Sequence, residues 1–323
     1  MKFTSALATI CAATIATAKN ILLTNDDGWA STGIRATYRE LTAAGHNVYL
    51  VAPVEQRSGY GGTFMFTYTS TLLHDDQFHY KKEGDPAWGH EESDDHIWYF
   101  NGTPSASVAF AFDYLLPTYF ANASIDLVVA GPNQGLNQDS LFTLSGTIGA
   151  TYNAVYRGYP AIAFSGSNSN NSFFKDSLND NPDDVQNIYA SKVVELVDTL
   201  FAAQGDNPVL LPRGTGLNVN FPKVASDSTT GCTDPKYTFA RLSGPEVVIS
   251  SLKFNSSTGL FTFSYGSAIG SNVIYHGDAA LPDENQVINH LDCTSDVALF
   301  SVDYTANIEQ ENEVRGMIGS ILS

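Results

Sequence analysis

Two adjacent carboxylates, Asp26 and Asp27, stand between a short apolar run and a glycine in the stretch NILLTNDDG at residues 20–28. Like charges placed side by side repel each other, and a bound divalent cation relieves that repulsion. Asn, Asp and Gly also favour tight turns, and most stretches of this composition are only turns. The motif by itself therefore has two interpretations, a polar turn or half of a cation site.

Three later motifs supply further polar groups: RSG at 57–59, GPNQGLN at 131–137 and LSGT at 144–147. Their oxygen-bearing side chains suit a hard cation such as Mg²⁺, Mn²⁺ or Ca²⁺ better than zinc. The SGT motif opens a predicted helix, whose first N–H groups favour an oxyanion such as phosphate. Each motif alone also has an ordinary explanation: a turn, a helix cap or, for Arg57, a surface ion pair.

Strands and helices alternate around these motifs. The apolar runs predict strands at residues 21–24, 47–52, 125–130 and 161–164, and helical patterns predict helices at 32–44, 103–116, 146–156 and 184–203. Strand–helix–strand units imply right-handed crossovers and a parallel sheet. Ligands of such sheets bind at the carboxyl ends of the strands, so the motifs are expected to meet at one edge.

Two regions depart from this alternation. Residues 60–100 predict a β insertion of antiparallel strands around a polar loop at 83–95, and the chain beyond residue 214 predicts short strands, turns and a last helix at 308–321. The acidic, His-containing part of that loop, residues 90–96, lacks a regular spacing of metal ligands and is interpreted as solvated. The fold class is therefore α/β, with a mainly parallel sheet, a β insertion and a β-rich C-terminal extension.

The chain has 323 residues and a formal net charge of −18 at pH 7. Such an excess of acidic groups argues against a surface that binds a nucleic-acid polymer, although a small anionic substrate held through a metal ion remains compatible. Residues 1–18 combine Lys2, a short apolar core and the Ala16-Thr17-Ala18 cleavage pattern, which predicts a secretory signal peptide. No later segment is long and apolar enough to span a membrane.

A secreted chain would keep Cys232 and Cys293 after loss of the signal. In an oxidising compartment these two cysteines are expected to pair, the alternative being two separate buried thiols. Four N-x-[ST] motifs, at Asn101, Asn122, Asn170 and Asn255, add glycosylation as an expectation.

Four ordered blocks of the sequence resemble the SurE survival-protein family: residues 21–41, 48–59, 101–111 and 126–165. The resemblance implies a Rossmann-like three-layer αβα domain over residues 19–323 and a metal-dependent nucleotidase or phosphatase. It covers roughly half of the mature chain in sequence order. The C-terminal half matches poorly, apart from a faint likeness at 294–302, and relatives use that half for oligomers.

The resemblance also implies roles for individual residues. Asp26 and Asp27 resemble the family's paired metal-ligating aspartates, Ser58 its metal-site serine and Asn133 its asparagine ligand. The residues expected to line the phosphate pocket or to support the aspartate pair are Asn25, Asn137, Ser145, Gly146 and Thr147. One departure is the pair Asn153-Ala154, where relatives often carry Glu-Gly.

The sequence is therefore interpreted as a secreted phosphomonoesterase that uses Mg²⁺ or Mn²⁺ and acts on nucleoside monophosphates or other small phosphate monoesters, with Asp26 and Asp27 as catalytic residues. A homodimer or a higher homo-oligomer is expected, without a membrane partner. A catalytically inactive, metal-binding or structural family member is an alternative, as is a serine esterase using Ser165. The esterase lacks the G-x-S-x-G motif, and the absence of G-x-G-x-x-G after the first strand argues against a dinucleotide oxidoreductase.

Overall fold

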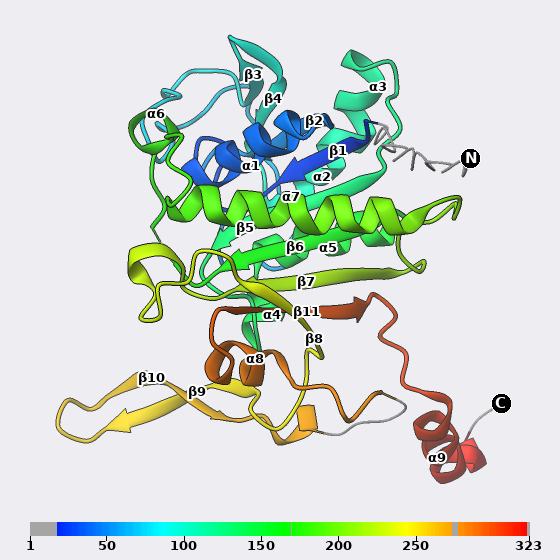
Figure 1. Cartoon of the computed structure of the whole chain (residues 1–323). Helices are drawn as coiled ribbons and strands as arrows, with labels where there is room; N and C mark the ends of the chain where they lie inside the picture. The colour runs from blue at the N-terminus through cyan, green and yellow to red at the C-terminus, as the bar shows by residue number, and fades with distance from the viewer. Residues whose placement is uncertain (1–17, 169, 273–276, 322–323) are drawn as a thin grey trace, which may run out of the picture.

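The computed structural model describes residues 18–168, 170–272 and 277–321, so the predicted signal peptide lies outside the described residues except for Ala18. Within them, one sheet of nine strands crosses the whole domain (Figure 1). Its spatial order is β3 (Trp88–Glu91), β4 (Asp94–Phe100), β2 (Asn47–Pro53), β1 (Asn20–Thr24), β5 (Leu127–Gln134), β6 (Ala161–Gly166), β7 (Thr215–Phe221), β11 (Thr294–Ser301) and β8 (Lys236–Ala240).

The central strands from β4 to β7 are all parallel, as the strand–helix alternation predicts. From β1 the chain first adds β2 on one side and later adds β5 on the other side. This reversal of strand order makes the carboxyl ends of β1 and β5 the switch point where ligands of such sheets bind. The Asp26–Asp27 pair follows β1 directly at this point.

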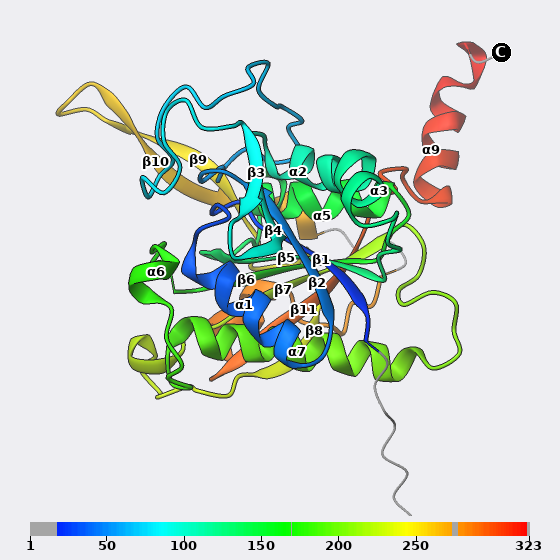
Figure 2. The same cartoon turned by 90° about the horizontal axis from the view of Figure 1, so that it is seen from above.

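Helices cover both faces of the sheet, which confirms the three-layer α/β prediction (Figures 1 and 2). Ile21 and Leu23 face the core under α1 (Thr32–Ala43) and α7 (Val185–Gln204), whereas Leu22 faces the core under α2 (Pro104–Phe110) and α5 (Gly146–Tyr156). Successive side chains of a strand point to opposite faces, so a strand between two helical layers is apolar at every position.

Several short helices complete these layers. The chain continues from α2 through the π-helical turn η1 (Ala111–Leu115) into α3 (Leu116–Tyr119), which extends the predicted helix at 103–116. The other short helical segments are α4 (Leu141–Leu144), α6 (Phe174–Ser177), η2 (Ala225–Asp227) and η3 (Ile269–Asn272).

The β insertion differs from the prediction. Residues 61–82 form turns and bends rather than antiparallel strands. Their aromatic side chains at Phe64, Phe66 and Tyr68 are about half exposed or more, and the backbone joins other segments through the isolated bridges Phe66–Gly102 and Thr71–Pro86 and through scattered hydrogen bonds. The first strand of the hairpin, β3, lies where a polar loop was predicted. Glu91 is not solvated either, because its Oε2 accepts a hydrogen bond from Arg35 Nη2 at 2.8 Å in a buried ion pair.

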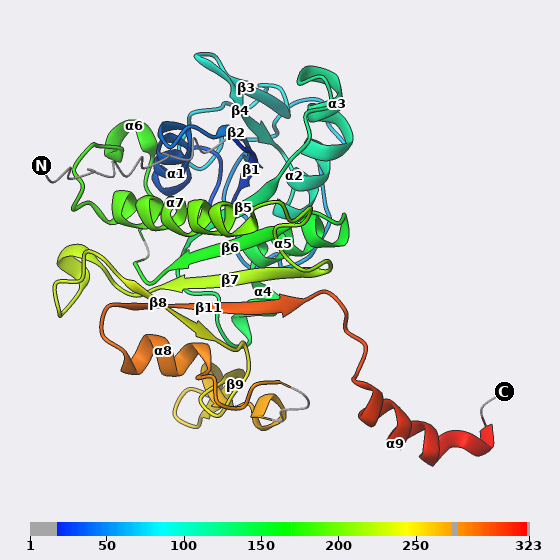
Figure 3. The same cartoon turned by 45° about the vertical axis from the view of Figure 1, so that its right-hand side comes forward.

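The C-terminal part confirms the prediction of a β-rich extension. β11 runs antiparallel to β7 and parallel to β8 at one edge of the sheet, and α8 (Glu284–His290) packs beside it. The hairpin of β9 (Val248–Asn255) and β10 (Leu260–Ser267) projects from the body, as does the last helix α9 (Ile308–Ile318) with its final turn η4 (Gly319–Ile321) (Figures 1 and 3).

Cys232 and Cys293 form a disulfide with a Cα–Cα distance of 5.3 Å, as the sequence predicts. The bond joins the segment that precedes β8 to the residue that precedes β11. It therefore ties the two outermost strands of this sheet edge together at their beginnings.

Replacing both cysteines by serine should lower the free energy of unfolding by about 4 kcal/mol, because the closed loop no longer restricts the unfolded chain. The two cysteines are separated by 61 residues in the sequence, and this separation sets the length of the closed loop. Urea denaturation of the Cys232→Ser, Cys293→Ser double variant measures the loss. A reducing agent should destabilise the wild type and leave the variant unchanged; equal stability of the two proteins would contradict the prediction.

Candidate active site

Asn25 shapes the loop that carries the two aspartates. Its Oδ1 accepts the Gly28 N–H at 3.2 Å, while its Nδ2 donates to Gly28 O and Ser31 Oγ, each at 3.1 Å. Gly28 has φ +101°, a left-handed conformation that glycine adopts without steric cost. The Asn25 side chain thus bonds within its own loop and supports the aspartate pair from behind.

Asp26 points at the beginning of α5. Thr147 Oγ1 donates to Asp26 Oδ1 at 2.8 Å, and Ser145 caps the helix by accepting the Ile148 N–H at 3.2 Å. Burial raises the pKa of the Asp26 carboxyl, while the Thr147 hydroxyl and the first N–H groups of the helix, including that of Gly146, lower it. The predicted phosphate-binding motif therefore lies against Asp26.

Asp27 lies on the β5 side of the same loop. Its Oδ2 accepts the Gln134 N–H at 3.0 Å, whereas its Oδ1 is buried and has no hydrogen-bond partner among the described residues. Burial, and next the charge of Asp26, raise the pKa of Asp27 well above its usual range. Two adjacent buried carboxylates without a basic partner are costly, and a cation would remove that cost.

Asn133 reaches this place through a break in the β5 register between Ala130 and Asn133. Gly131 is required there, because a Cβ on it would lie 2.2 Å from Phe164 O. Asn133 Nδ2 donates to Gly135 O at 2.7 Å, and no described residue bonds to the buried Oδ1. Asn133 Oδ1 and Asp27 Oδ1 are thus two buried acceptors on neighbouring segments, as a cation site requires.

Ser58 completes the predicted set from the turn after β2. The preceding N–H, that of Arg57, donates to Asp26 O at 2.6 Å and so attaches this turn to the aspartate loop. Ser58 itself is exposed, unlike the other predicted ligands. Among the described residues no group of three or more His, Cys, Asp and Glu side chains could hold a metal. The donor set that fits a hard cation here consists of two carboxylates, one hydroxyl and one amide oxygen.

Asn137 is buried and bonds to the strands beyond β5. Its Nδ2 donates to Ser165 Oγ at 2.6 Å, and Ser165 is the register partner of Asn133 across β5 and β6. Its main-chain N–H donates to Asn220 Oδ1 at 2.9 Å. The loop after β5 is therefore fixed from β6 and β7.

Three supporting residues of the site were missed from the sequence. Gln77 Nε2 and Asn171 Nδ2 donate to Asp27 O at 2.6 and 3.0 Å, and the Gln134 N–H contacts the Asp27 carboxylate. Gln134 stands inside the GPNQGLN motif and could have been found there. Gln77 and Asn171 belong to irregular loops, and no sequence signal places them beside Asp27.

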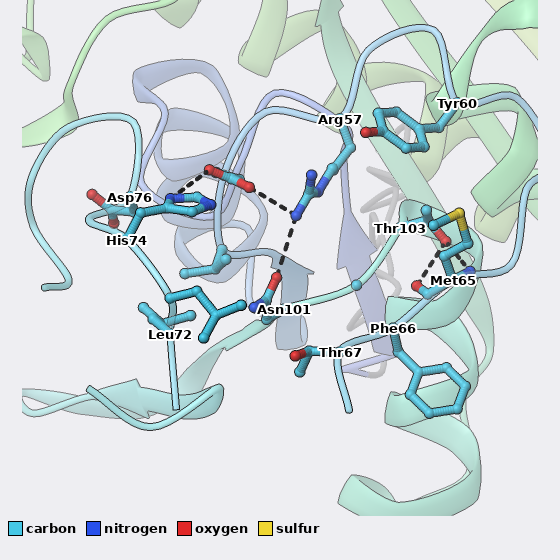
Figure 4. Close-up of a pocket in the computed structure, with 14 residues that line it drawn as sticks. Arg57, Tyr60, Met65, Phe66, Thr67, Leu72, His74, Asp76, Asn101 and Thr103 are labelled. Carbon is cyan, nitrogen blue, oxygen red and sulfur yellow. Dashed lines mark hydrogen bonds and ion pairs between the residues drawn. The ribbon is translucent and has the colours of Figure 1, made fainter. Parts of the chain in front are cut away.

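A cavity of about 250 Å³ lies next to the site (Figure 4). Arg57 points into it, pairs with Glu55 at 2.7 Å and donates to Asn101 Oδ1 at 3.3 Å. The remaining wall combines apolar and aromatic side chains, among them Val54, Tyr60, Met65, Phe66 and Leu72, with polar ones, among them Thr67, His74, Asp76 and Thr103. Glu55 balances the charge of Arg57 and Asp76 adds a carboxylate, so this cavity suits an amphipathic group without negative charge.

The family model described as "Survival protein SurE" matches residues 21–243. A Yarrowia lipolytica protein named "Acid phosphatase" is 45% identical over 288 residues, which cover 88% of this chain and 80% of that protein. A "5'-nucleotidase SurE" of Desulfovibrio desulfuricans is 32% identical over 210 residues, 64% of this chain and 68% of that protein.

A solved structure with the same fold is the SurE protein of Aquifex aeolicus. The likeness has a TM-score of 0.61 at 21% sequence identity and covers 92% of this chain and 99% of that one. With 92% of the chain covered, the likeness extends beyond residue 243, where the family model ends.

Gly146→Ala should lower the free energy of unfolding by about 1 to 3 kcal/mol, because the new methyl group would overpack the site. A Cβ at Gly146 would lie 2.9 Å from Asp26 Cβ and 3.0 Å from Arg57 O. The matched control is Gly316→Ala in α9, where a Cβ meets nothing within 4 Å. Chemical denaturation should show a loss of stability for the first variant only; equal stability of both variants would contradict the close packing of α5 against Asp26.

Proposed function

This chain belongs to the SurE survival-protein family, and we propose that it is a phosphomonoesterase that depends on a divalent cation, Mg²⁺ or Mn²⁺. The observation that carries the proposal is the pair of partnerless buried oxygens, Asp27 Oδ1 and Asn133 Oδ1, beside Asp26. Asp26, Asp27, Ser58 and Asn133 would hold the cation. The substrates proposed are nucleoside monophosphates or other small phosphate monoesters.

When bound, the cation would polarise the phosphoryl group and lower the pKa of a water molecule. Residues of the chain position the two carboxylates that would hold the cation. Thr147 and the first N–H groups of α5 fix Asp26, while Gln134 fixes one oxygen of Asp27 and leaves the other free. The positive end of the α5 dipole, at Ser145 to Thr147, would stabilise negative charge on the phosphoryl oxygens.

The cavity beside Arg57 would receive the leaving group. The Arg57 guanidinium lies 5.6 Å from the centre of the Tyr60 ring, and Phe66 is about half exposed at the rim. Exposed aromatic rings stack on planar groups such as nucleobases, while polar groups bind hydroxyls. The lining of the cavity therefore favours substrates in which the phosphate is esterified to an alcohol that carries a ring.

A serine esterase and a catalytically inactive family member receive less support. Ser165 is completely buried and its Oγ accepts a hydrogen bond from Asn137, which argues against a serine esterase nucleophile. All four proposed metal ligands are present at one edge of the sheet, as an active member of the family requires.

The proposed function is exercised outside the cell. The Cys232–Cys293 disulfide supports an oxidising compartment, and three of the four sequons, at Asn122, Asn170 and Asn255, are exposed. Asn101 accepts a hydrogen bond from Arg57 in the cavity wall, so it should stay unmodified. None of the helices in the described ranges has both the length and the apolar character needed to cross a membrane.

Self-association is proposed for the projecting hairpin. Leu252, Leu260, Phe261 and Phe263 of β9 and β10 are each more than 60% exposed. Apolar side chains grouped in this way are typical of protein–protein contacts. A homodimer or a higher homo-oligomer would cover them.

Asp26→Asn should reduce hydrolysis of p-nitrophenyl phosphate by about 10²- to 10³-fold or more, because the charge that holds the cation is removed. The folded state should persist, as judged by circular dichroism. Asp113→Asn is the matched control, because this exposed aspartate only pairs with Arg157 at the surface. Wild-type activity should disappear in EDTA and return with excess Mn²⁺; full activity of Asp26→Asn would refute the proposed site.

Adding Mn²⁺ should raise the melting temperature of the wild type, because a ligand that binds only the folded state stabilises it. Protons compete with the cation for Asp27, whose pKa is raised by burial and by Asp26, so the shift should shrink as the pH falls. Differential scanning fluorimetry with and without Mn²⁺ measures this shift in melting temperature at each pH. Asp27→Asn should lose most of this shift, and retention of the full shift would place the cation elsewhere.

A further inference from the structure

Two carboxyl groups lie buried behind the candidate site, between β7, β11 and α8. Asp296 belongs to β11 and Glu284 is the first residue of α8, and both are at most 2% exposed. In the parts of the chain that the structure describes, neither carboxyl has an ion-pair partner. Two neighbouring carboxylates cannot both stay ionised in such a place at low cost.

Hydrogen bonds distinguish the two groups. Both oxygens of Asp296 accept, from Asn220 Nδ2 at 3.1 Å and from Gln138 Nε2 at 2.9 Å. Two donors, one on each oxygen, favour the ionised form. Asp296 is therefore the better candidate for the negative charge.

Glu284 has the opposite pattern. Its Oε1 accepts from Asn218 Nδ2 at 2.7 Å, while its Oε2 is buried and finds no partner in the part of the chain that the structure describes. Asn218 Oδ1 also lacks a partner. A proton on Glu284 Oε2 would be a donor and Asn218 Oδ1 the acceptor, so an acid–amide pair would satisfy both atoms at once.

The same asparagines hold the loop of the site. Asn218 Nδ2 donates to Asn137 O at 2.9 Å, and the Asn137 N–H donates to Asn220 Oδ1 at 2.9 Å. Asn137 in turn donates to Ser165, the register partner of Asn133. The two carboxyls thus act on the loop after β5 through Asn218, Asn220 and Gln138.

We propose that Glu284, in its neutral form, and Asp296, in its ionised form, are positioning residues that hold the loop at residues 135–139 so that Asn137 keeps its place beside the phosphate. This inference rests on the proposed phosphatase function, which gives Asn137 its role. Neither carboxyl touches the substrate; each acts through the amide groups that fix the loop.

The arrangement makes the loop sensitive to pH. The acidic groups that face Glu284 are Asp296 from β11, Asp139 from the loop and Asp283 from the α8 cap, while Arg241 directs its Nε to Leu281 O. Burial raises the pKa of Glu284 well above its usual range and that of Asp296 to about 7. A carboxyl whose pKa is raised on folding stabilises the fold at low pH, and this contribution is lost as the pH rises through the folded value. Glu284 should therefore lose its proton, and the loop its position, as the pH rises through the raised pKa of Glu284.

The test compares Glu284→Gln and Asp296→Asn with the wild type, measuring kcat and KM for p-nitrophenyl phosphate with saturating Mn²⁺ from about pH 5 to pH 9. Glutamine reproduces the acid–amide pair, since its oxygen accepts from Asn218 Nδ2 and its N–H can donate to Asn218 Oδ1. Glu284→Gln should therefore match the wild type at acid pH and avoid its rise in KM at alkaline pH. Asparagine at 296 directs its own N–H₂ donor at one of the two groups that donate to Asp296. KM should therefore rise about tenfold above about pH 7, where Asp296 is ionised.

Glu91→Gln is the matched control, because it is a buried carboxyl at the opposite edge of the sheet, paired with Arg35. It should lower the melting temperature without changing KM or the pH profile. The inference is overturned if Glu284→Gln keeps the wild-type pH profile, if it loses activity at acid pH, or if Asp296→Asn leaves KM unchanged. An inactive wild type would instead refute the phosphatase function itself, so the two failures are distinguishable.

Discussion

Burial of two adjacent carboxylates at the end of β1 is the constraint on which the rest of the site depends. Asp26 and Asp27 are 2% and 1% exposed, and nothing basic is paired with them in the described chain. Each neighbouring segment bonds to the aspartate loop differently. α5 contributes a hydroxyl and N–H groups, β5 contributes one N–H, and the turn after β2 contributes a main-chain hydrogen bond. One oxygen of Asp27 remains free, and a cation is the partner that suits it.

Close approach of backbone segments follows from that constraint. The helix α5 can bring its first turn to Asp26 because Gly146 has no side chain, and β5 can bring Asn133 forward because Gly131 lies tightly against Phe164 O. These glycines have no chemistry of their own. They determine how near the polar groups of the site come to one another.

The C-terminal extension, which resembles the family least, contributes to the same site from behind. β11 and α8 bring Asp296 and Glu284 to the asparagines of β7, and those asparagines bind the loop that follows β5. Buried polar networks of this kind are costly unless every member is satisfied. A neutral Glu284 completes the hydrogen bonds of this network. The geometry of the site thus depends on the protonation state of Glu284 in the C-terminal extension.

The sequence by itself determined the parallel sheet and the helices on its two faces, because hydrophobic periodicity and turn chemistry are local. Its resemblance to the SurE family supplied the candidate ligands. The sequence also determined the disulfide, since only Cys232 and Cys293 remain after the predicted signal. Tertiary structure alone decided the course of residues 61–82, where aromatic residues favour strands but find no partner strand. It likewise decided that Glu91 is buried against Arg35, and that Gln77 and Asn171 support Asp27. Such contacts join residues far apart in the chain, and no local pattern specifies which distant groups will meet.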